Sequence, residues 1–233
     1  MVVSTYRPYF APFPGFFQKA MISDVLVLLD SVQFPRGTTW LNRNRFKNDQ
    51  GTYWMTVPVW KKGLGLQKID EVRIYKEGPW AMKHLASLKS AYAKAPFFEA
   101  HEPFFEKLFS KVPELLVDMN LTIFRHIMAH LEIPARVVLL SKLKITAREP
   151  DLSMTICREL GATCFLAQAS AGKYLPGELF ERDGIELRFF RPRTVVYPQL
   201  WGPFIGNLST LDLLFNCGPA ARGILGKALP GRS

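Results

Sequence analysis

Two arginines separated by one residue, Arg43 and Arg45, could together hold an anion. In an extended strand successive side chains point to opposite faces, so Arg43 and Arg45 share one face while Asn42 and Asn44 share the other. Two guanidinium groups about 7 Å apart can grip a phosphate or a carboxylate through forked hydrogen bonds. We therefore expect Arg43, Asn44 and Arg45 to bind substrate. The alternative is the charged outer face of an antiparallel sheet.

A carboxylate and an amide follow the apolar run from Val25 to Leu29. Asp30 and Gln33 come directly after that run, which is typical of a strand buried on both faces. Ligands of open parallel sheets sit at the carboxyl ends of the strands. We expect Asp30 to act as a base or to orient an amine, with Gln33 binding substrate. A loop-capping aspartate is the competing interpretation.

A second polar turn follows the apolar segment that ends near Ala167. Ser170, Lys173 and Tyr174 surround Gly172, which allows a backbone to approach a ligand closely, and the lysine supplies a positive charge. We expect these three side chains to bind substrate. The alternative is a tight turn that leads into the next helix, because one glycine and one lysine are a weak phosphate signal.

The segment from Tyr197 to Pro219 combines rigid and polar residues with a single cysteine, Cys217. Tyr197, Asn207 and Asn216 are predicted substrate contacts, and Asp212 and Cys217 are predicted catalytic groups. A helix is expected over residues 208–215, capped by Ser209 and ended by the Gly-Pro pair after the cysteine. A thiolate is disfavoured at a helix C-terminus, so a small buried core residue is the alternative for Cys217.

The four histidines all fall in the central part of the chain. His126 and His130 are four residues apart, so they share one helix face and could ligate a metal. A third ligand such as Glu102 is not fixed by the sequence, and the His-Glu-x-x-His pattern is absent. We expect a hydrogen-bonded or exposed histidine pair here and no metal site.

Composition and charge limit the classes of protein. The chain has 233 residues, a net charge of +10 and three cysteines. No apolar run reaches the length of about eighteen residues that a membrane span requires, and the first residues do not resemble a signal peptide. Three cysteines without metal spacing favour reduced thiols and a cytoplasmic protein. The basic residues are scattered, so we expect a folded basic face for an anionic partner and regard nucleic acid as unlikely.

Hydrophobic periodicity indicates one α/β domain over residues 1–233, with a mostly parallel sheet and flanking helices. An antiparallel hairpin extends from it, and residues 79–132 form a mostly helical insertion, with Pro79, Pro103 and Pro113 near helix starts. The expected strands of the parallel sheet are residues 2–5, 25–29, 136–140, 163–167 and 187–190. Expected helices include residues 16–23, 152–160 and 176–182. The hairpin strands are expected at residues 39–46 and 52–59, with a third strand at 69–75 beside them. Neither G-x-G-x-x-G nor a P-loop occurs, so no nucleotide cofactor is expected.

Five segments together resemble the WbqC-like family, whose members are associated with bacterial surface-polysaccharide clusters. They are YRPYFAPFPGFFQKA from Tyr6, DVLVLLDSVQF from Asp24, WLNRNRFK from Trp40, TVPV from Thr56 and the run from Tyr197 to Pro219. The resemblance implies substrate contacts at Tyr6 and Arg7, although the family usually reads His-Gln-Pro where this chain has Tyr-Arg-Pro.

Glycine transfer has been suggested for one branch of that family. By resemblance, we expect an acyl- or aminoacyl-transferase that forms an amide on an amine acceptor, such as an amino sugar, from an activated donor. An acidic carrier protein that presents this donor would suit a basic face. The alternative is a non-enzymatic basic module that binds sugar phosphate, a lipid carrier or RNA. We also expect one cleft at the carboxyl edge of the sheet to be lined by Asp30, Gln33, Arg43, Asn44, Ser170, Asn207 and Asp212.

Overall fold

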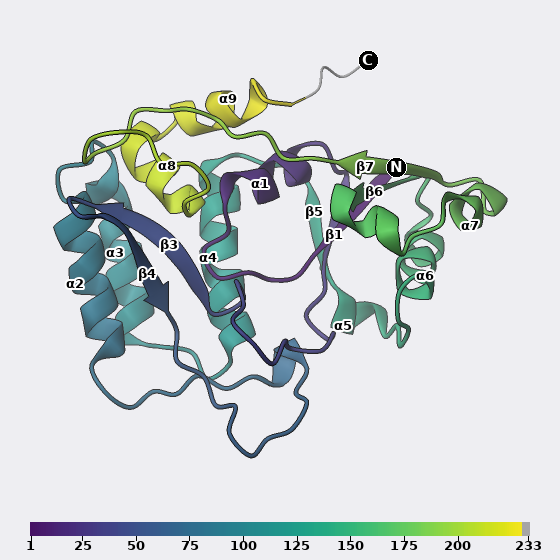
Figure 1. Cartoon of the computed structure of the whole chain (residues 1–233), viewed down its shortest axis with the longest axis horizontal. Coiled ribbons are helices and arrows are strands. Elements are labelled where there is room, and N and C mark those ends of the chain that lie inside the picture. Colours follow the sequence, from purple (N-terminus) through teal and green to yellow (C-terminus); the bar gives the residue numbers. More distant parts are fainter. Residues whose placement is uncertain (230–233) are drawn as a thin grey trace.

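The computed structural model describes residues 1–229, and a five-stranded parallel sheet lies at its centre (Figure 1). The strand order is β5-β2-β1-β6-β7, and every neighbouring pair runs parallel. The strands are β1 (Val2–Tyr6), β2 (Val25–Leu28), β5 (Arg136–Leu139), β6 (Cys164–Gln168) and β7 (Glu186–Phe190). The predicted α/β class, with a mostly parallel sheet and flanking helices, is confirmed.

Helices cover both faces of the sheet, which explains why its central strands are apolar on both sides. On one face, Leu26 and Leu28 pack with the cluster that includes α1 and α4. On the other face, Val25 and Val27 pack with the cluster that includes α6 and α7. These helices are α1 (Pro14–Met21), α4 (Leu116–His130), α6 (Asp151–Leu160) and α7 (Gly177–Arg182).

The predicted hairpin forms a separate two-stranded antiparallel sheet, β3 (Arg43–Asn48) and β4 (Gly51–Thr56). The third strand expected beside it, over residues 69–75, is wrong. The 3-10 helix η1 (Ile69–Glu71) begins there, and only isolated bridges join Ile74 to Val59 and Arg73 to Leu115. The alternating pattern has a different cause, because Ile69, Val72 and Ile74 all point into the core from an irregular segment.

Three helices occupy the region that was expected to be helical: α2 (Trp80–Tyr92), α3 (Phe98–Ser110) and α4. Pro79 precedes α2 directly, as the sequence predicts. Pro103 was expected near a helix start but lies inside α3, which begins five residues earlier at Phe98. Figure 1 shows these helices beside the hairpin, on one side of the sheet. No helix within residues 1–229 is long and apolar enough to cross a membrane.

The C-terminal helix forms where the sequence predicts it. In α8 (Thr210–Cys217), the hydroxyl of Ser209 accepts a hydrogen bond from the backbone N–H of Leu211, and Gly218 ends the helix with a positive φ. A Cβ at this glycine would lie 2.4 Å from Phe97, so both the backbone angle and the space require glycine. Three further short helices were not predicted: α5 (Leu140–Leu143), the 3-10 helix η2 (Ala169–Lys173) and α9 (Ala220–Gly226).

The order of the strands reverses at β1. The chain builds outward from β1 through β2 to β5, then returns to place β6 and β7 on the other side of β1. The loops after β1 and β6 therefore leave the sheet toward opposite faces and open a crevice between them. In α/β proteins this switch point is where ligands bind.

Candidate functional site

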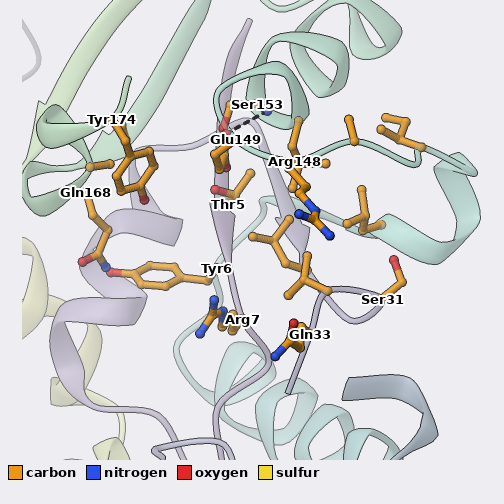
Figure 2. Close-up of a pocket in the computed structure, with 18 of the residues that line it drawn as sticks. Thr5, Tyr6, Arg7, Ser31, Gln33, Arg148, Glu149, Ser153, Gln168 and Tyr174 are labelled. Atoms are coloured by element: carbon orange, nitrogen blue, oxygen red, sulfur yellow. Dashed lines mark hydrogen bonds between the residues drawn. The ribbon is translucent and has the colours of Figure 1, made fainter. Parts of the chain in front are cut away.

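A cavity of about 1050 Å3 lies at this switch point, at the carboxyl ends of β1, β2 and β6 (Figure 2). Its size is at the upper end of the range for small-molecule sites. Its walls come from segments far apart in the sequence, because the loops after three strands and the segment before α6 meet here. The polar lining includes Thr5, Tyr6, Arg7, Tyr9, Lys19, Ser31, Gln33, Lys68, Arg148, Glu149, Ser153, Gln168, Ser170 and Tyr174.

The lining carries an excess of positive charge. Four basic side chains contribute to it, Arg7, Lys19, Lys68 and Arg148, against one carboxylate, Glu149. Among residues 1–229, none of these four basic groups forms an ion pair with a protein carboxylate. Arg7, Lys68 and Arg148 are exposed, so their charge is available to a ligand, and a phosphate or carboxylate is the group that matches it.

Lys19 is the most unusual of the basic residues, because it is fully buried. Its ammonium group donates a hydrogen bond to the backbone oxygen of Thr5 at 3.0 Å and lies 4.5 Å from the centre of the Tyr6 ring. Burial lowers the pKa of Lys19 to about 7. At neutral pH a substantial share of this amine is uncharged, so it can accept a proton, which an ordinary surface lysine cannot do.

The hydroxyl of Tyr6 is a second polar group with unused capacity. It is buried and points at the side chain of Gln168, as Figure 2 shows, but the two groups form no well-aligned hydrogen bond. Burial raises the pKa of Tyr6, so the phenol stays protonated and can donate. A buried donor without a well-aligned partner in a cavity wall is a natural contact for a bound ligand.

Glu149 is the one carboxylate in the lining, and its oxygens are engaged at the start of α6. They accept hydrogen bonds from the hydroxyl of Ser153 at 2.8 Å and from its backbone N–H at 3.2 Å (Figure 2). Desolvation raises the pKa of Glu149, and the two bonds from Ser153 oppose that shift. The carboxylate thus caps the helix and leaves the neighbouring Arg148 free to face the cavity.

Five of the sequence-predicted substrate contacts line this cavity: Tyr6, Arg7, Gln33, Ser170 and Tyr174. They come from the loops after β1, β2 and β6, as the rule about carboxyl ends of parallel strands predicts. Lys173 is exposed next to them, but it is not part of the lining. Substrate binding by these residues stays a prediction, and the cavity that they line gives a place where a substrate could bind.

Asp30 follows β2 as expected, but its side chain turns away from the cavity lining. One oxygen accepts a hydrogen bond from the backbone N–H of Ser141 at 2.9 Å, and the other accepts one from its hydroxyl at 2.6 Å. Because Ser141 lies in the first turn of α5, the carboxylate caps this short helix. The geometry therefore supports the loop-capping alternative for Asp30 over its role as a base.

Asp212 lies in a different place, within a buried polar network on α8. Its oxygens accept hydrogen bonds from the hydroxyls of Tyr92 and Tyr197 at 2.8 and 2.9 Å and from the side chain of Gln199 at 3.0 Å. Burial raises the pKa of Asp212, and these bonds, together with the nearby Lys47, oppose the shift. Asn216 donates to the backbone oxygen of Asp212 at 2.8 Å, so two further predicted site residues join the same network.

Arg43, Asn44 and Arg45 alternate across β3 as predicted, with Asn44 buried and the arginines partly exposed. Asn44 donates to the backbone oxygen of Ala11 at 2.6 Å. Arg45 donates to the backbone oxygen of Asn207 at 3.1 Å. The guanidinium of Arg43 lies 3.6 Å from the ring centre of Trp54. These residues hold the hairpin and the C-terminal segment together.

The expectation that one cleft holds all seven residues, from Asp30 to Asp212, is therefore wrong. Gln33 and Ser170 belong to the sheet-edge cavity, whereas Arg43, Asn207 and Asp212 belong to the hairpin and α8. The physical reason lies in the path of the chain. The segment from Tyr197 to Asn207 does not return to the carboxyl edge of the sheet but runs to β3. The hydrogen bond from Arg45 and a backbone bond from Ser209 to Arg45 hold it there.

Cys217 is buried at the end of α8, with its sulfur 4.0 Å from the backbone oxygen of Pro198. Burial, reinforced by the negative charge of Asp212, raises the pKa of Cys217 to about 11. The thiol is protonated at neutral pH, and the thiolate is the nucleophilic form. A buried core thiol, the alternative interpretation, is what this environment supports.

Sequence reasoning missed Lys19, Arg148 and Gln168 as lining residues. Lys19 looks like a solvent-facing helix residue, yet α1 is buried on nearly all sides, including at Gln18. The usable signal was the aromatic and proline-rich composition around α1, which is typical of a helix covered all round. Nothing in the local pattern around Arg148 indicates that the segment before α6 reaches the end of β1.

The predicted histidine pair forms, and a third histidine joins it. His101 from α3 lies against His126 and His130 from α4, whereas Glu102 is held by Lys89 at 2.6 Å. The helix crossing that brings α3 onto α4 could not be derived from spacing alone.

Fold and cavity together define an α/β protein with a basic cavity at the switch point of a parallel sheet. The chain belongs to the WbqC-like protein family, whose family model matches residues 7–224. That match also covers the central helices, which the five recognised segments leave out. The chain is also 29% identical over 222 residues to the "Uncharacterized protein Rv1507c" of Mycobacterium tuberculosis, covering 94% of this chain and 95% of that protein. No solved structure matches significantly.

Proposed function

We propose that this protein is an acyl- or aminoacyl-transferase that forms an amide on an amine acceptor bearing phosphate or carboxylate groups. The single observation that carries the proposal is Lys19, a buried amine with a pKa of about 7 in the wall of a basic 1050 Å3 cavity. The suggestion of glycine transfer in one branch of the family supports the reaction type, and a nucleotide-linked amino sugar has the size and charge that the cavity fits.

Arg7 and Arg148 supply the proposed anion-binding part of the site. Both guanidinium groups reach the cavity without an ion-pair partner among residues 1–229. Arginine forks match phosphate and carboxylate oxygens in two-point contacts, which fix orientation as well as charge. The hydroxyls of Tyr6 and Tyr174 complete the polar wall and suit the hydroxyl groups of a sugar.

Lys19 takes the role that the sequence assigned to Asp30, whose carboxylate caps α5. An amine acceptor arrives largely as an ammonium ion, and neutral Lys19 removes one proton from it. The freed amine attacks the acyl carbonyl carbon, so a C–N bond forms while the bond to the donor's leaving group breaks. As the amide forms, the nitrogen loses its second proton to the leaving thiolate or alkoxide, and protonated Lys19 releases the first proton to water, which regenerates the neutral amine. Cys217 is not required, because its thiol is protonated.

The test is an amide-formation assay with purified protein. A panel of nucleotide-linked amino sugars and glycyl or acyl thioesters is incubated with the chain, and mass spectrometry records the acceptor's mass gain. Lys19→Met should lower product formation at pH 7 by at least about a hundredfold, the scale of general base catalysis. The matched control is Lys142→Met, an exposed lysine on α5, which should leave the rate unchanged.

The rate should also depend on pH in one direction. Only neutral Lys19 accepts a proton, so kcat/KM should fall as pH drops below about 7, the folded pKa of that amine. An active Lys19→Met enzyme, or a panel that yields no amide product at all, would contradict the proposal.

The second candidate function is non-enzymatic binding of a sugar phosphate, a lipid carrier or RNA. The observation that favours it is an exposed surface on the hairpin, where Arg43 covers Trp54 and Trp40 lies 5.4 Å from the same ring. Arginine and tryptophan together stack on bases and sugars. Stoichiometric binding of the nucleotide-linked amino sugars without any amide product would favour this function. Affinity for generic RNA that falls steeply with salt would identify RNA as the partner.

The proposed reaction takes place in the cytoplasm. All three cysteines are free in the structure, as expected for a reducing compartment. An acidic carrier protein that delivers the acyl group remains part of this proposal, and the positive net charge of the chain supports it.

A further inference from the structure

Three of the four histidines gather at one place, where α3 crosses α4. His126 and His130 stand one turn apart on α4, and His101 reaches them from α3. A nitrogen atom from each ring lies within 4.8 Å of a nitrogen from each of the others. The cluster belongs to the helical side of the molecule, on different elements from those that line the sheet-edge cavity (Figure 1).

The three imidazole rings lie close together. Ring centroids are 4.5 Å apart for His101 and His130, 4.3 Å for His126 and His130, and 5.1 Å for His101 and His126. His101 Nδ1 lies 2.9 Å from His126 Nε2, so one of these nitrogens donates a hydrogen bond to the other. Nitrogens around a tetrahedral ion with metal–nitrogen distances of about 2.0–2.1 Å lie about 3.4 Å apart. A small rotation of the side chains therefore turns this contact into a ligand pair.

The third ring already presents the required nitrogen. His130 Nδ1 lies 2.8 Å from the backbone oxygen of His126, and because a carbonyl oxygen only accepts, Nδ1 carries the hydrogen. The other nitrogen, Nε2, then has the free lone pair. A backbone carbonyl that fixes the tautomer in this way is the usual outer support of a metal-binding histidine.

Aromatic side chains hold the cluster from behind and leave one side open. Phe104 stacks on His126 with centroids 3.8 Å apart, and Phe215 lies 5.4 Å from His101. His101 is buried and His130 is exposed, so the three nitrogens lie at the border between core and solvent. Such a site has three protein ligands and room for a water molecule as the fourth.

We propose that His101, His126 and His130 bind one divalent transition-metal ion, and that Zn²⁺ is the ion they fit best. Three imidazoles with an open fourth position are a known ligand set for zinc, and imidazole also suits Ni²⁺, Co²⁺ and Cu²⁺. Each ring keeps one N–H and binds as the neutral imidazole. Binding replaces the hydrogen bond between His101 and His126 with two metal–nitrogen bonds and ties α3 to α4.

A cluster that serves packing alone is the competing explanation. In that case the hydrogen bond between His101 and His126 and the stacking on Phe104 would hold the rings together without any ion. The two explanations differ in whether the exposed His130 matters, since packing depends little on an exposed ring.

The test uses the full chain without a histidine tag, first stripped with a chelator and then titrated with Co²⁺. Wild type should bind one Co²⁺ per chain and develop the visible absorption of a tetrahedral ion, which Zn²⁺ then displaces. His130→Ala and His126→Ala should each weaken Co²⁺ binding at least tenfold, because each removes a ligand. His84→Ala is the control. This ring bonds the backbone oxygen of Thr56 outside the cluster, so its loss should leave binding unchanged.

The His130→Ala variant should fold normally, because the side chain of His130 is exposed. A loss of metal binding in this variant therefore reflects the loss of a ligand and not a folding defect. Its melting temperature without metal should match that of wild type. Zn²⁺ should raise the melting temperature of wild type and of His84→Ala, but not that of His130→Ala. Absence of stoichiometric Co²⁺ binding by wild type would overturn the metal site. Equal Co²⁺ affinity in wild type and His130→Ala would overturn it as well.

Discussion

The cavity at the sheet edge and the network around Asp212 are both rich in polar side chains, yet they use them in opposite ways. In the network the donors and acceptors satisfy one another, since Tyr92, Tyr197 and Gln199 all bond to the same carboxylate. In the cavity the guanidinium of Arg7 has no ion-pair partner among residues 1–229, and the buried hydroxyl of Tyr6 points at Gln168 without a well-aligned hydrogen bond. Polar groups that are satisfied internally stabilise a fold, and polar groups left free can bind a ligand.

The largest expected effect is on the network. Asp212→Ala removes the acceptor for three buried donors and the negative charge near Lys47. We expect the free energy of unfolding to fall by about 3–5 kcal/mol, because each unpaired buried group carries a desolvation penalty. Urea unfolding measures the change. Asp49→Ala, at an exposed hairpin turn, should change stability by less than about 0.5 kcal/mol.

If Asp212→Ala instead leaves stability near that of wild type while it abolishes amide formation, the comparison breaks. The network would then be the catalytic region, as the sequence first suggested.

An intermediate effect is expected from the pH dependence of stability at Lys19. The folded pKa of this amine is about 7, below the 10.5 of an unfolded lysine, so the unfolded chain binds more protons between those values. Wild-type stability relative to Lys19→Met should therefore rise with pH, by about 2–3 kcal/mol from pH 6 to pH 9. Parallel urea unfolding of both proteins measures the difference, since other titrating groups are shared. A difference that stays constant with pH would mean that Lys19 remains charged when folded.

The smallest expected effect is on ligand affinity. It tests directly whether the cavity, and not the hairpin, binds the anion. Arg7→Gln should weaken binding of the tightest nucleotide-linked amino sugar about tenfold, the scale of one charge-assisted hydrogen bond. Arg45→Gln should change it by less than about twofold, because Arg45 bonds the backbone of Asn207 outside the cavity. Isothermal titration calorimetry compares the two variants. Greater weakening by Arg45→Gln than by Arg7→Gln would assign the anion to the hairpin.

Local patterns in the sequence predict the elements of this fold well. The apolar runs around Leu26 and Phe165 become buried parallel strands, and Ser209 and Gly218 delimit α8 as their types require. Such features depend on neighbours within a few residues, which the sequence displays. The third hairpin strand failed because its alternating apolar residues contact α4 and the core rather than a strand.

Only part of the site could be predicted from the sequence. The position of a residue after a strand follows from the topology of the sheet, whereas its hydrogen-bond partners depend on contacts with distant parts of the chain. Residues that follow a strand, such as Gln33 and Ser170, line the cavity as expected, since the carboxyl ends of parallel strands share an edge. The partners of Asp30 and Arg45 lie 111 and 162 residues away, and no local pattern indicates them. Whether a polar side chain is free or already satisfied is a tertiary property. For that reason the sequence suggests Asp30 and Asp212 as catalytic groups but cannot show that their carboxylates are already hydrogen-bonded within the protein.

The central position of β1 also has a consequence for how the protein is made. β1 pairs with β2 about twenty residues later, but with β6 only after more than 150 residues have been added. Long-range pairing is slow, and during synthesis at the ribosome one edge of β1 stays unpaired until β6 emerges. A ligand bound in the cavity between the loops after β1 and β6 would stabilise the native chain more strongly as its concentration rises, and with it this late pairing.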